Sequence, residues 1–283
     1  MPRPARRAVT LAGLAALAAC GAPDPAPESA TGNAAPAPRI ATPAREATAR
    51  GDANANASSL LDFLRATYGP DARLTQPWMD PDGRERRVCT RGGSPDADAW
   101  PSLVAVCASV PDCMGSGPGS VDYYALARTA SGVRAEAQAR EVASGNNGCA
   151  GDVRVVRFGR ARWGFLDHGG VTSQGYVIGW VALRSFRAGR LEELASVNTA
   201  FDNNGARCDA ADCRDAGISL NSDVRFDASD AQADAWPLVV HQSGVECGLN
   251  VDRSRRYEFD AARFRYPVPD GPPDVACPPV ATP

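Results

Sequence analysis

The sequence predicts an all-β protein whose antiparallel hairpins form a propeller-like body or a two-sheet sandwich, with one short N-terminal helix and disulfide bracing. After Pro70, apolar and polar residues alternate with a period near two, and the alternating runs flank glycine-containing turns. Eight of the nine cysteines follow an export signal, as in disulfide-stabilised exported proteins. With 283 residues, 44% hydrophobic and 22% charged, the composition is that of a globular protein.

The first folded element is predicted to be a short amphipathic helix. The pair Ser58-Ser59 supplies an N-cap, and Leu60, Leu64 and Tyr68 recur at i, i+4 and i+8 on one face. Gly69-Pro70 then ends the helix. We expect the apolar face to pack on the edge of the β domain.

Four hairpins are predicted after this helix, each from two alternating runs around a glycine-containing turn. The paired runs are 73–79 with 84–90, 123–129 with 133–142, 176–187 with 190–197, and 238–242 with 245–251. Residues 133–142 are rich in Ala, Glu, Gln and Arg, which favour helix. Their strict alternation of small and long polar side chains nevertheless indicates a strand.

Two recurrences leave the arrangement of the sheets open. The turn glycines 83, 132, 189 and 244 are separated by 49, 57 and 55 residues, close to the length of a four-stranded propeller blade. The pentapeptide Ala-Asp-Ala-Trp-Pro occurs at 97–101 and again at 233–237, each time before an apolar strand. Two stacked sheets without blades would accommodate the same pattern.

The cysteines that follow Cys20 are expected to form four disulfides. They are Cys89, Cys107, Cys113, Cys149, Cys208, Cys213, Cys247 and Cys277. Spacing favours a short bridge between Cys208 and Cys213 and a long one between Cys247 and Cys277, and leaves the pairing of the first four open. The chain lacks a Cys-x-x-Cys pair, so we expect neither a zinc site nor a redox centre, and we assign no metal ligand and no cofactor.

The N-terminus has the pattern of an export signal. Arginines at 3, 6 and 7 precede an apolar run over 9–19, which is too short to span a bilayer. The run ends in Leu17-Ala18-Ala19-Cys20, which resembles the lipobox of bacterial lipoproteins. The resemblance implies that residues 1–19 are a cleaved signal peptide and that Cys20 is lipidated. Gly21 after the cysteine, in place of aspartate, implies sorting to the outer membrane, with the body in the periplasm.

Residues 20–57 are predicted to be a tether, and residues 58–283 a single disulfide-rich β domain. The segment 21–57 consists of Ala, Pro, Gly and polar residues with no aromatic side chain, so it lacks the apolar surface needed to fold. As a flexible coil it would reach about 30–36 Å. Signal cleavage removes three arginines and takes the formal net charge from −3 to −6. That acidic balance offers no basic surface for nucleic acid.

Candidate catalytic residues are few. Asp167-His168 pairs a carboxylate with an imidazole, but neighbours on a strand point to opposite faces. His241 lies in an apolar strand, and neither histidine has a partner at usable sequence spacing. The segment 170–175 is one residue away from a Gly-x-Ser-x-Gly elbow, with no helix signal after it. We therefore expect both histidines to be dispensable, and we assign no catalytic residue.

Two acidic segments, 80–83 and 202–205, resemble incomplete calcium loops, and we expect both to be turns. The wider acidic stretch from Asp202 to Asp215 could still gather oxygens for a weak calcium site.

Two functions from different classes fit this sequence. The first is a binding or inhibitory, immunity-type module that contacts another envelope protein through loops of a rigid sheet. The alternative is a periplasmic hydrolase acting on cell-wall material. Weak signals for nucleophile, base and metal favour binding. Aromatic side chains dominate protein interfaces, so the predicted contact surface includes Trp163, Phe165, Tyr176 and Trp180.

Overall fold

The computed structural model describes residues 59–93, 102–115, 117–129, 132–207 and 217–269, which form an all-β fold of two antiparallel sheets. The first sheet contains β1 (Trp78–Met79), β2 (Glu85–Gly92), β3 (Ser102–Ser109), β4 (Gly119–Thr129) and β5 (Gly132–Ser144). The second contains β6 (Asp152–Arg157), β7 (Trp163–Ser173), β8 (Tyr176–Arg187), β9 (Arg190–Asp202), β10 (Ile218–Phe226), β11 (Leu238–Glu246) and β12 (Leu249–Tyr257).

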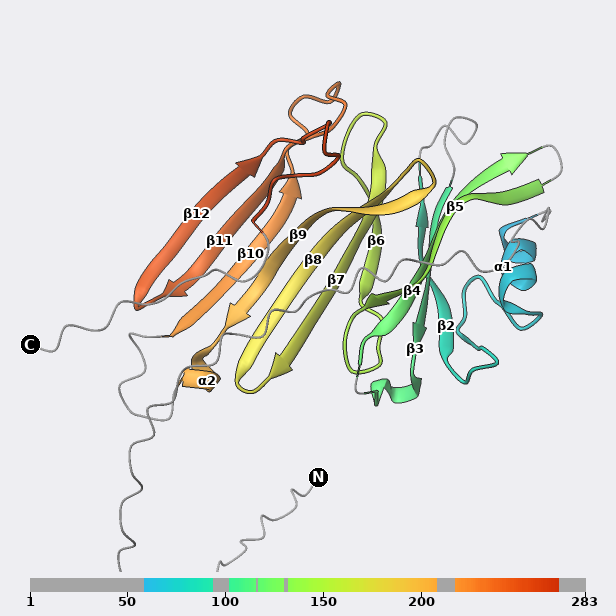
Figure 1. The fold of residues 1–283 in the computed structure, drawn as a ribbon, viewed down its shortest axis with the longest axis horizontal. Helices are drawn as coiled ribbons and strands as arrows, with labels where there is room; N and C mark the ends of the chain where they lie inside the picture. The colour runs from blue at the N-terminus through green and yellow to red at the C-terminus, as the bar shows by residue number, and fades with distance from the viewer. Residues whose placement is uncertain (1–58, 94–101, 116, 130–131, 208–216, 270–283) are drawn as a thin grey trace, which may run out of the picture. The chain divides into compact units, whose positions relative to one another are not determined.

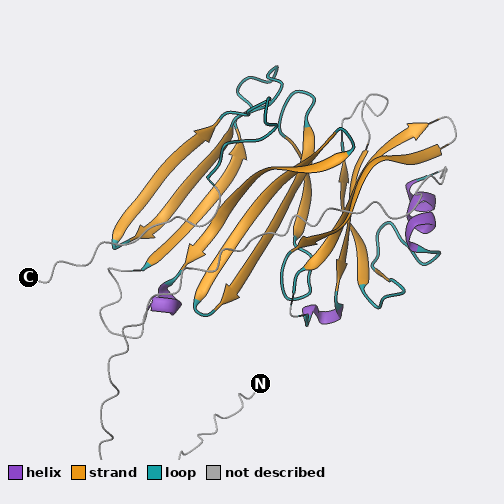
Figure 2. Cartoon of the chain, in the orientation of Figure 1, coloured by secondary structure: helices purple, strands orange, loops and turns teal. Residues whose placement is uncertain are grey.

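Each sheet is a simple meander, in which every strand pairs with the next strand along the chain (Figure 1). The order is β1-β2-β3-β4-β5 in one sheet and β12-β11-β10-β9-β8-β7-β6 in the other. Short helical pieces, η1 (Pro111–Cys113) and α2 (Asn204–Arg207), lie in connections between strands (Figure 2). The two sheets replace the four-stranded blades that the spacing of the turn glycines had suggested.

The predicted helix is α1 (Leu60–Tyr68). The Ser59 hydroxyl accepts a hydrogen bond from the Asp62 backbone N–H at 3.2 Å, which caps the first turn. At the other end, the N–H of Gly69 donates to the Arg65 carbonyl, and Gly69 has a φ of 96°. Leu64 and Tyr68 of the predicted face are buried on the first sheet with Phe63 beside them, and Leu60 is partly buried there.

Three of the four predicted hairpins are confirmed. β1 pairs with β2, β4 with β5, and β8 with β9. The β8–β9 turn consists of Ala188 and Gly189, both with positive φ, as a tight two-residue hairpin requires. The segment with conflicting helix and strand signals is the long strand β5.

The fourth hairpin exists, but its predicted turn was wrong. Gly244 lies inside β11, opposite Leu220 on β10 and Val251 on β12, and the turn is formed by Cys247 and Gly248. A Cβ at Gly244 would lie 2.1 Å from the Ser219 carbonyl oxygen. Gly244 is therefore needed for close approach of two strands, and the recurrence of turn glycines near 50 residues does not hold.

A shared apolar core joins the two sheets. Leu103, Val121 and Tyr123 of the first sheet pack with Val153 and Phe165 of the second. The rings of Tyr123 and Phe165 have centroids 4.8 Å apart. The opposite face of the first sheet is covered by α1, so β4 is buried on both faces over residues 121–126.

A second core lies beneath the segment that follows β12. Phe264, Tyr266 and Val268 pack against strand residues that include Leu183 and Leu238. The N–H of Tyr266 donates to the Leu194 carbonyl of β9, and its hydroxyl donates to the Trp236 carbonyl. Trp236, from the second Ala-Asp-Ala-Trp-Pro copy, is 9% exposed, as expected for a tryptophan beneath a strand start. The first copy, at 97–101, lies outside the described residues.

Candidate functional site

Alternate connections of a meander lie at the same end of its sheet, and this brings six connections together. β5 and β6 are joined by residues 145–151, so this end is common to both sheets. We call it the braced end; in the described part of the chain it consists of residues 80–84, 110–115, 117–118, 145–151, 174–175, 203–207, 217 and 247–248. It lies along the lower side of the ribbon in Figure 1.

Large apolar side chains are exposed at this end. The described residues include five exposed large hydrophobics, and each lies in a connection of the braced end or within two residues of one. They are Met79 (52% exposed), Val110 (41%), Met114 (83%), Val177 (42%) and Leu249 (72%). Two of these residues, Val110 and Met114, lie in the same connection, which makes this part of the braced end a candidate interaction surface.

The loop that carries Val110 and Met114 is held by backbone hydrogen bonds to the β5–β6 connection. The N–H of Val110 donates to the Gly148 carbonyl at 2.8 Å, and that of Gly115 donates to the Asn147 carbonyl at 3.1 Å. The backbones of Gly115 and Gly148 are so close that a Cβ on Gly115 would lie 2.8 Å from the Gly148 Cα. Met114 therefore projects from a fixed backbone.

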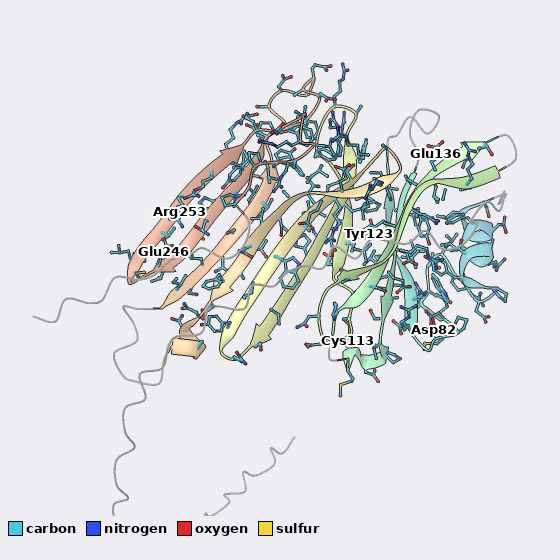
Figure 3. All side chains as sticks on the ribbon, viewed as in Figure 1. Asp82, Cys113, Tyr123, Glu136, Glu246 and Arg253 are labelled. Atoms are coloured by element: carbon cyan, nitrogen blue, oxygen red, sulfur yellow. A yellow bond between two sulfur atoms is a disulfide. The ribbon has the colours of Figure 1, made fainter. Side chains whose placement is uncertain are left out.

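A disulfide between Cys113 and Cys149 ties the same two loops together. Figure 3 labels Cys113 at the short helical turn η1 on the lower side of the ribbon. Asp112 and Cys113 have φ values of 57° and 55°, and Asn147 on the facing loop has 53°. Each left-handed non-glycine residue costs about 1–3 kcal/mol and persists only where its surroundings enforce it, a pattern typical of functional loops.

Most buried charges of the first sheet belong to one network centred on Arg86. Its guanidinium donates to Asp80 at 2.7 Å, Asp122 at 3.1 Å and Glu141 at 2.8 Å. Arg84 reaches the same Glu141 carboxylate with two hydrogen bonds, at 2.6 and 3.1 Å. Arg86 and Asp122 are 3% and 0% exposed, so the network is largely shielded from water.

Tyr68 of α1 extends this network to the helix. Its hydroxyl donates to Asp122 at 2.7 Å and lies 2.7 Å from the Tyr124 hydroxyl. The guanidinium groups of Arg86 and Arg140 lie 5.0 and 5.4 Å from the centre of the Tyr68 ring. Burial, followed by the nearby Tyr124 and Asp122, raises the pKa of Tyr68 well above its usual value. The tyrosine is thus a neutral hydrogen-bond donor.

Burial alone would raise the pKa of Glu141, but hydrogen bonds from Arg84, Arg86 and Ser120 outweigh it and lower that pKa to about 2. A general acid or base at neutral pH needs a pKa near 7. The carboxylate is therefore suited to an ion pair and poorly suited to proton transfer.

This low pKa predicts a loss of stability in acid. Because the folded-state pKa of Glu141 is depressed, its contribution is complete above the ordinary value near 4.5 and is lost as pH falls toward 2. The side chain is 45% exposed, so after screening we expect a contribution of about 1 kcal/mol. The free energy of unfolding, measured by urea titration between pH 6 and pH 3, should fall less steeply in Glu141→Gln than in wild type. Equal slopes would contradict the assignment.

A second buried network joins the sheets at Asp167. Its carboxylate accepts hydrogen bonds from the Tyr123 hydroxyl at 3.0 Å and the Ser144 hydroxyl at 2.6 Å, and it pairs with Arg184. Arg184 also donates to Glu193 at 3.2 Å. His168 is half-buried and follows Asp167 on β7, where successive side chains point to opposite faces. Asp167 is thus engaged by groups other than the neighbouring imidazole.

His241 has partners that sequence spacing did not reveal. Its Nδ1 lies 3.1 Å from the Ser254 hydroxyl across the β11–β12 ladder, and its Nε2 lies 3.6 Å from Asp252. The expectation that neither histidine has a usable partner was therefore wrong for His241. Asp252 is 85% exposed and His241 43% exposed. Catalytic triads place the carboxylate in a shielded position, whereas the carboxylate of Asp252 faces solvent.

The predicted aromatic contact surface is wrong in one member. Phe165 is fully buried between the sheets and cannot contact a partner. Trp163 and Tyr176 are half-buried and pack against the apolar cores, and Trp180 is half-buried over Gly169. A Cβ on Gly169 would lie 2.6 Å from the Trp180 ring. The positions of these four aromatic side chains are explained by packing within the protein rather than by contact with a partner.

The segment 80–83 is a turn, as expected, whereas in 202–205 Asp202 ends β9 and Asn204 begins the short helix α2. Asp80 Oδ1 accepts the N–H groups of Asp82 and Arg84, each at 2.9 Å, and Asp202 Oδ1 accepts that of Asn204 at 2.9 Å. No three His, Cys, Asp or Glu side chains in the described ranges are grouped to hold a metal ion. The rest of the acidic stretch, 208–216, lies outside those ranges.

The structure pairs the first four cysteines as Cys89–Cys107 and Cys113–Cys149. Cys247 is also disulfide-bonded. Cys208, Cys213 and Cys277, with the bridges predicted for them, lie outside the described residues. So do the signal peptide, Cys20 and the tether. No helix in the part of the chain that the structure describes is long and apolar enough to cross a membrane.

A groove of about 490 Å³ opens at the opposite end of the first sheet. Val104 and Leu126 form part of its apolar floor, and Arg91 and Arg128 lie at its rim. The chain leaves this groove directly into 94–101 and 130–131, which are not among the described residues. Val110 and Met114 lie in the described part of the braced end, and we take this end as the candidate site.

Comparison with known proteins supplies no family or function for this chain. No protein-family model, curated protein or solved structure matches it.

The sequence held only a weak signal for the braced end. Pro111 and the neighbouring Cys113 and Met114 could have been read as a constrained turn with an exposed thioether. Exposure of Met114 depends on how the β3–β4 and β5–β6 connections meet, and these lie about 35 residues apart in sequence.

Proposed function

We propose that the protein is an outer-membrane lipoprotein whose periplasmic body is a binding module, of the inhibitory or immunity type, for another envelope protein. In this proposal Cys20 carries the lipid anchor, residues 21–57 are the spacer, and the braced end is the contact surface. The lipobox resemblance implies a diacylglycerol on the Cys20 sulfur and an acyl chain on its nitrogen; these three chains would hold the protein stably, because two or more are sufficient.

The observation that carries the proposal is a rigid, apolar loop exposed at the braced end. Met114 is 83% exposed although its backbone is tied by hydrogen bonds and lies next to the Cys113–Cys149 disulfide. A loop already fixed in its bound shape loses little conformational entropy on binding. Methionine adds an apolar side chain that adapts to the shape of a partner.

The acidic clusters support binding over catalysis. Asp80 and Asp122 pair with Arg86, and Asp167 pairs with Arg184. Burial would raise the pKa of Asp80, but hydrogen bonds from Arg84 and Arg86 outweigh it and the pKa is lowered. A glycosidic acid requires the opposite shift.

The alternative function, a periplasmic hydrolase of cell-wall material, has one observation in its favour. His241 contacts Ser254 with Asp252 nearby, which is the set of groups used in nucleophilic catalysis. Turnover of purified peptidoglycan that is abolished in Ser254→Ala would establish this alternative. Under the binding proposal there is no turnover, and His168→Ala with His241→Ala leaves complementation of a deletion strain unchanged.

The lipid anchor gives a direct prediction. Cys20→Ser removes the sulfur that would carry diacylglycerol, so the protein should no longer incorporate an alkyne fatty acid and should leave the membrane fraction. Quantitative immunoblotting of membrane and soluble fractions measures this. Ser58→Ala, downstream of the cleavage site, is the matched control and should stay membrane-bound. Unchanged fractionation of Cys20→Ser would refute the anchor.

The contact surface gives a second prediction. A photo-crosslinking amino acid at Asp112, which is exposed beside Met114, should join the protein to one discrete envelope protein in living cells. The same amino acid at Arg190, exposed in the hairpin at the opposite end, should not. Adding Val110→Asp should lower the yield at least tenfold, since a charge in an apolar contact costs more than the corresponding 1.4 kcal/mol. Equal yields from both positions would refute the proposed surface.

A further inference from the structure

The braced end carries every methionine that the structure describes. Apart from Met1, the chain has two methionines, and these are Met79 and Met114. They are 52% and 83% exposed, whereas methionine is among the residue types most often buried. Both side chains are available to a dissolved oxidant without any opening of the fold.

The cysteines near them are already protected from peroxide. Cys89, Cys107, Cys113, Cys149 and Cys247, which are all the cysteines in the described ranges, are disulfide-bonded. The reactive form of cysteine is the thiolate, which a disulfide lacks. Within the described residues, the two thioethers are therefore the sulfur atoms most readily oxidised.

From this arrangement we propose that Met114, with Met79 as a secondary position, is a reversible oxidation site that releases the partner bound at the braced end. The inference rests on the proposed binding function. The oxidant is a hydroperoxide, in the simplest case hydrogen peroxide. The sulfur lone pair attacks one peroxide oxygen, the S–O bond forms and the O–O bond breaks. The sulfur loses two electrons, the proton on the transferred oxygen passes to the departing hydroxide, and the second oxygen of hydrogen peroxide leaves as water.

The product is suited to a switch at this position. A sulfoxide is polar and accepts hydrogen bonds, so it disfavours burial in an apolar contact. Met114 makes little packing contact in the free protein because it is 83% exposed. Oxidation should therefore weaken partner binding while the fold is unchanged. The Met114 backbone is held by its neighbours Cys113 and Gly115, so the oxidised side chain stays at the braced end.

The first test follows the oxidation itself. The exported protein is treated with hydrogen peroxide, and peptides are analysed by mass spectrometry over time. We expect Met114 to gain one oxygen faster than Met79, in line with their exposures, with an unchanged circular dichroism spectrum. Failure of Met114 to oxidise, or unfolding that accompanies its oxidation, overturns the inference.

The second test separates this inference from the function on which it rests. Cross-linking from Asp112 is measured before peroxide, after peroxide, and after repair with methionine sulfoxide reductase. We expect at least a tenfold loss of yield and its recovery on repair. Met114→Leu keeps an apolar side chain that cannot form a sulfoxide, and its yield should resist peroxide. Met114→Gln should reduce the yield without peroxide.

Each remaining outcome has a definite meaning. A cross-link that is absent before peroxide overturns the proposed binding function. A cross-link that survives full oxidation of Met114 overturns the switch and leaves the binding function standing. An equal loss in Met114→Leu would place the sensitive group elsewhere, and so would also overturn the switch.

Discussion

Replacing Arg86 with methionine should lower the free energy of unfolding by about 3–5 kcal/mol, because it leaves buried carboxylates without their cation. Arg86 is 3% exposed and contacts Asp80, Asp122 and Glu141. Methionine fills much of the volume of the arginine side chain. The loss of stability therefore reflects the missing charge and hydrogen bonds more than a new cavity. Urea unfolding followed by tryptophan fluorescence measures the change.

The next residue provides the matched control. Arg87 lies on the same strand but is exposed, and Arg87→Met should change the free energy of unfolding by less than about 0.5 kcal/mol. If Arg86→Met does not accumulate, Arg86→Lys keeps the charge with fewer hydrogen bonds and should give an intermediate loss. Equal stability of the two methionine variants would show that the network contributes little.

Local signals account for the part of the fold that the sequence predicted. The helix has its cap, its apolar spacing and its glycine stop within residues 59–69. The turn Ala188-Gly189 lies between two alternating runs, and β8 begins and ends at the predicted residues Tyr176 and Arg187. In both cases the deciding contacts lie within one helix or one hairpin.

Gly244 shows where local reasoning failed. Ser243-Gly244 and Cys247-Gly248 are both plausible turns in the sequence. The choice depends on β10, which places Leu220 opposite Gly244 and makes any Cβ there collide with Ser219. A glycine required by a neighbouring strand has the same sequence signature as a turn glycine.

The charge networks were missed for a related reason. Asp122 precedes Tyr123 and Tyr124 within a buried strand, and a carboxylate in such an apolar run is a sign of a buried ion pair. Its partner Arg86 comes from a strand 36 residues earlier, and β2 contains two other arginines, Arg87 and Arg91. Only the register of β2, β3 and β4 determines which arginine turns inward.

Replacing Asp167 with alanine should have an effect as large as that of Arg86→Met, about 3–5 kcal/mol, because it removes the acceptor shared by two sheets. Arg184 would remain buried with its contact to the partly exposed Glu193, and the hydroxyls of Tyr123 and Ser144 would lose their acceptor. Asp167→Asn keeps an acceptor oxygen while removing the charge, so it should cost less than alanine. Urea unfolding of the wild-type protein and of the two Asp167 variants measures these changes in the free energy of unfolding.

His168→Ala is the control that makes this prediction specific. His168 follows Asp167 on β7 but points away from the network, so its removal should change the free energy of unfolding by less than about 1 kcal/mol. The histidine variant should also keep the cross-link from Asp112, since its side chain has no part in the braced end. If alanine at 168 were as destabilising as alanine at 167, the network between the sheets would not be the cause, and general disturbance of β7 would explain both.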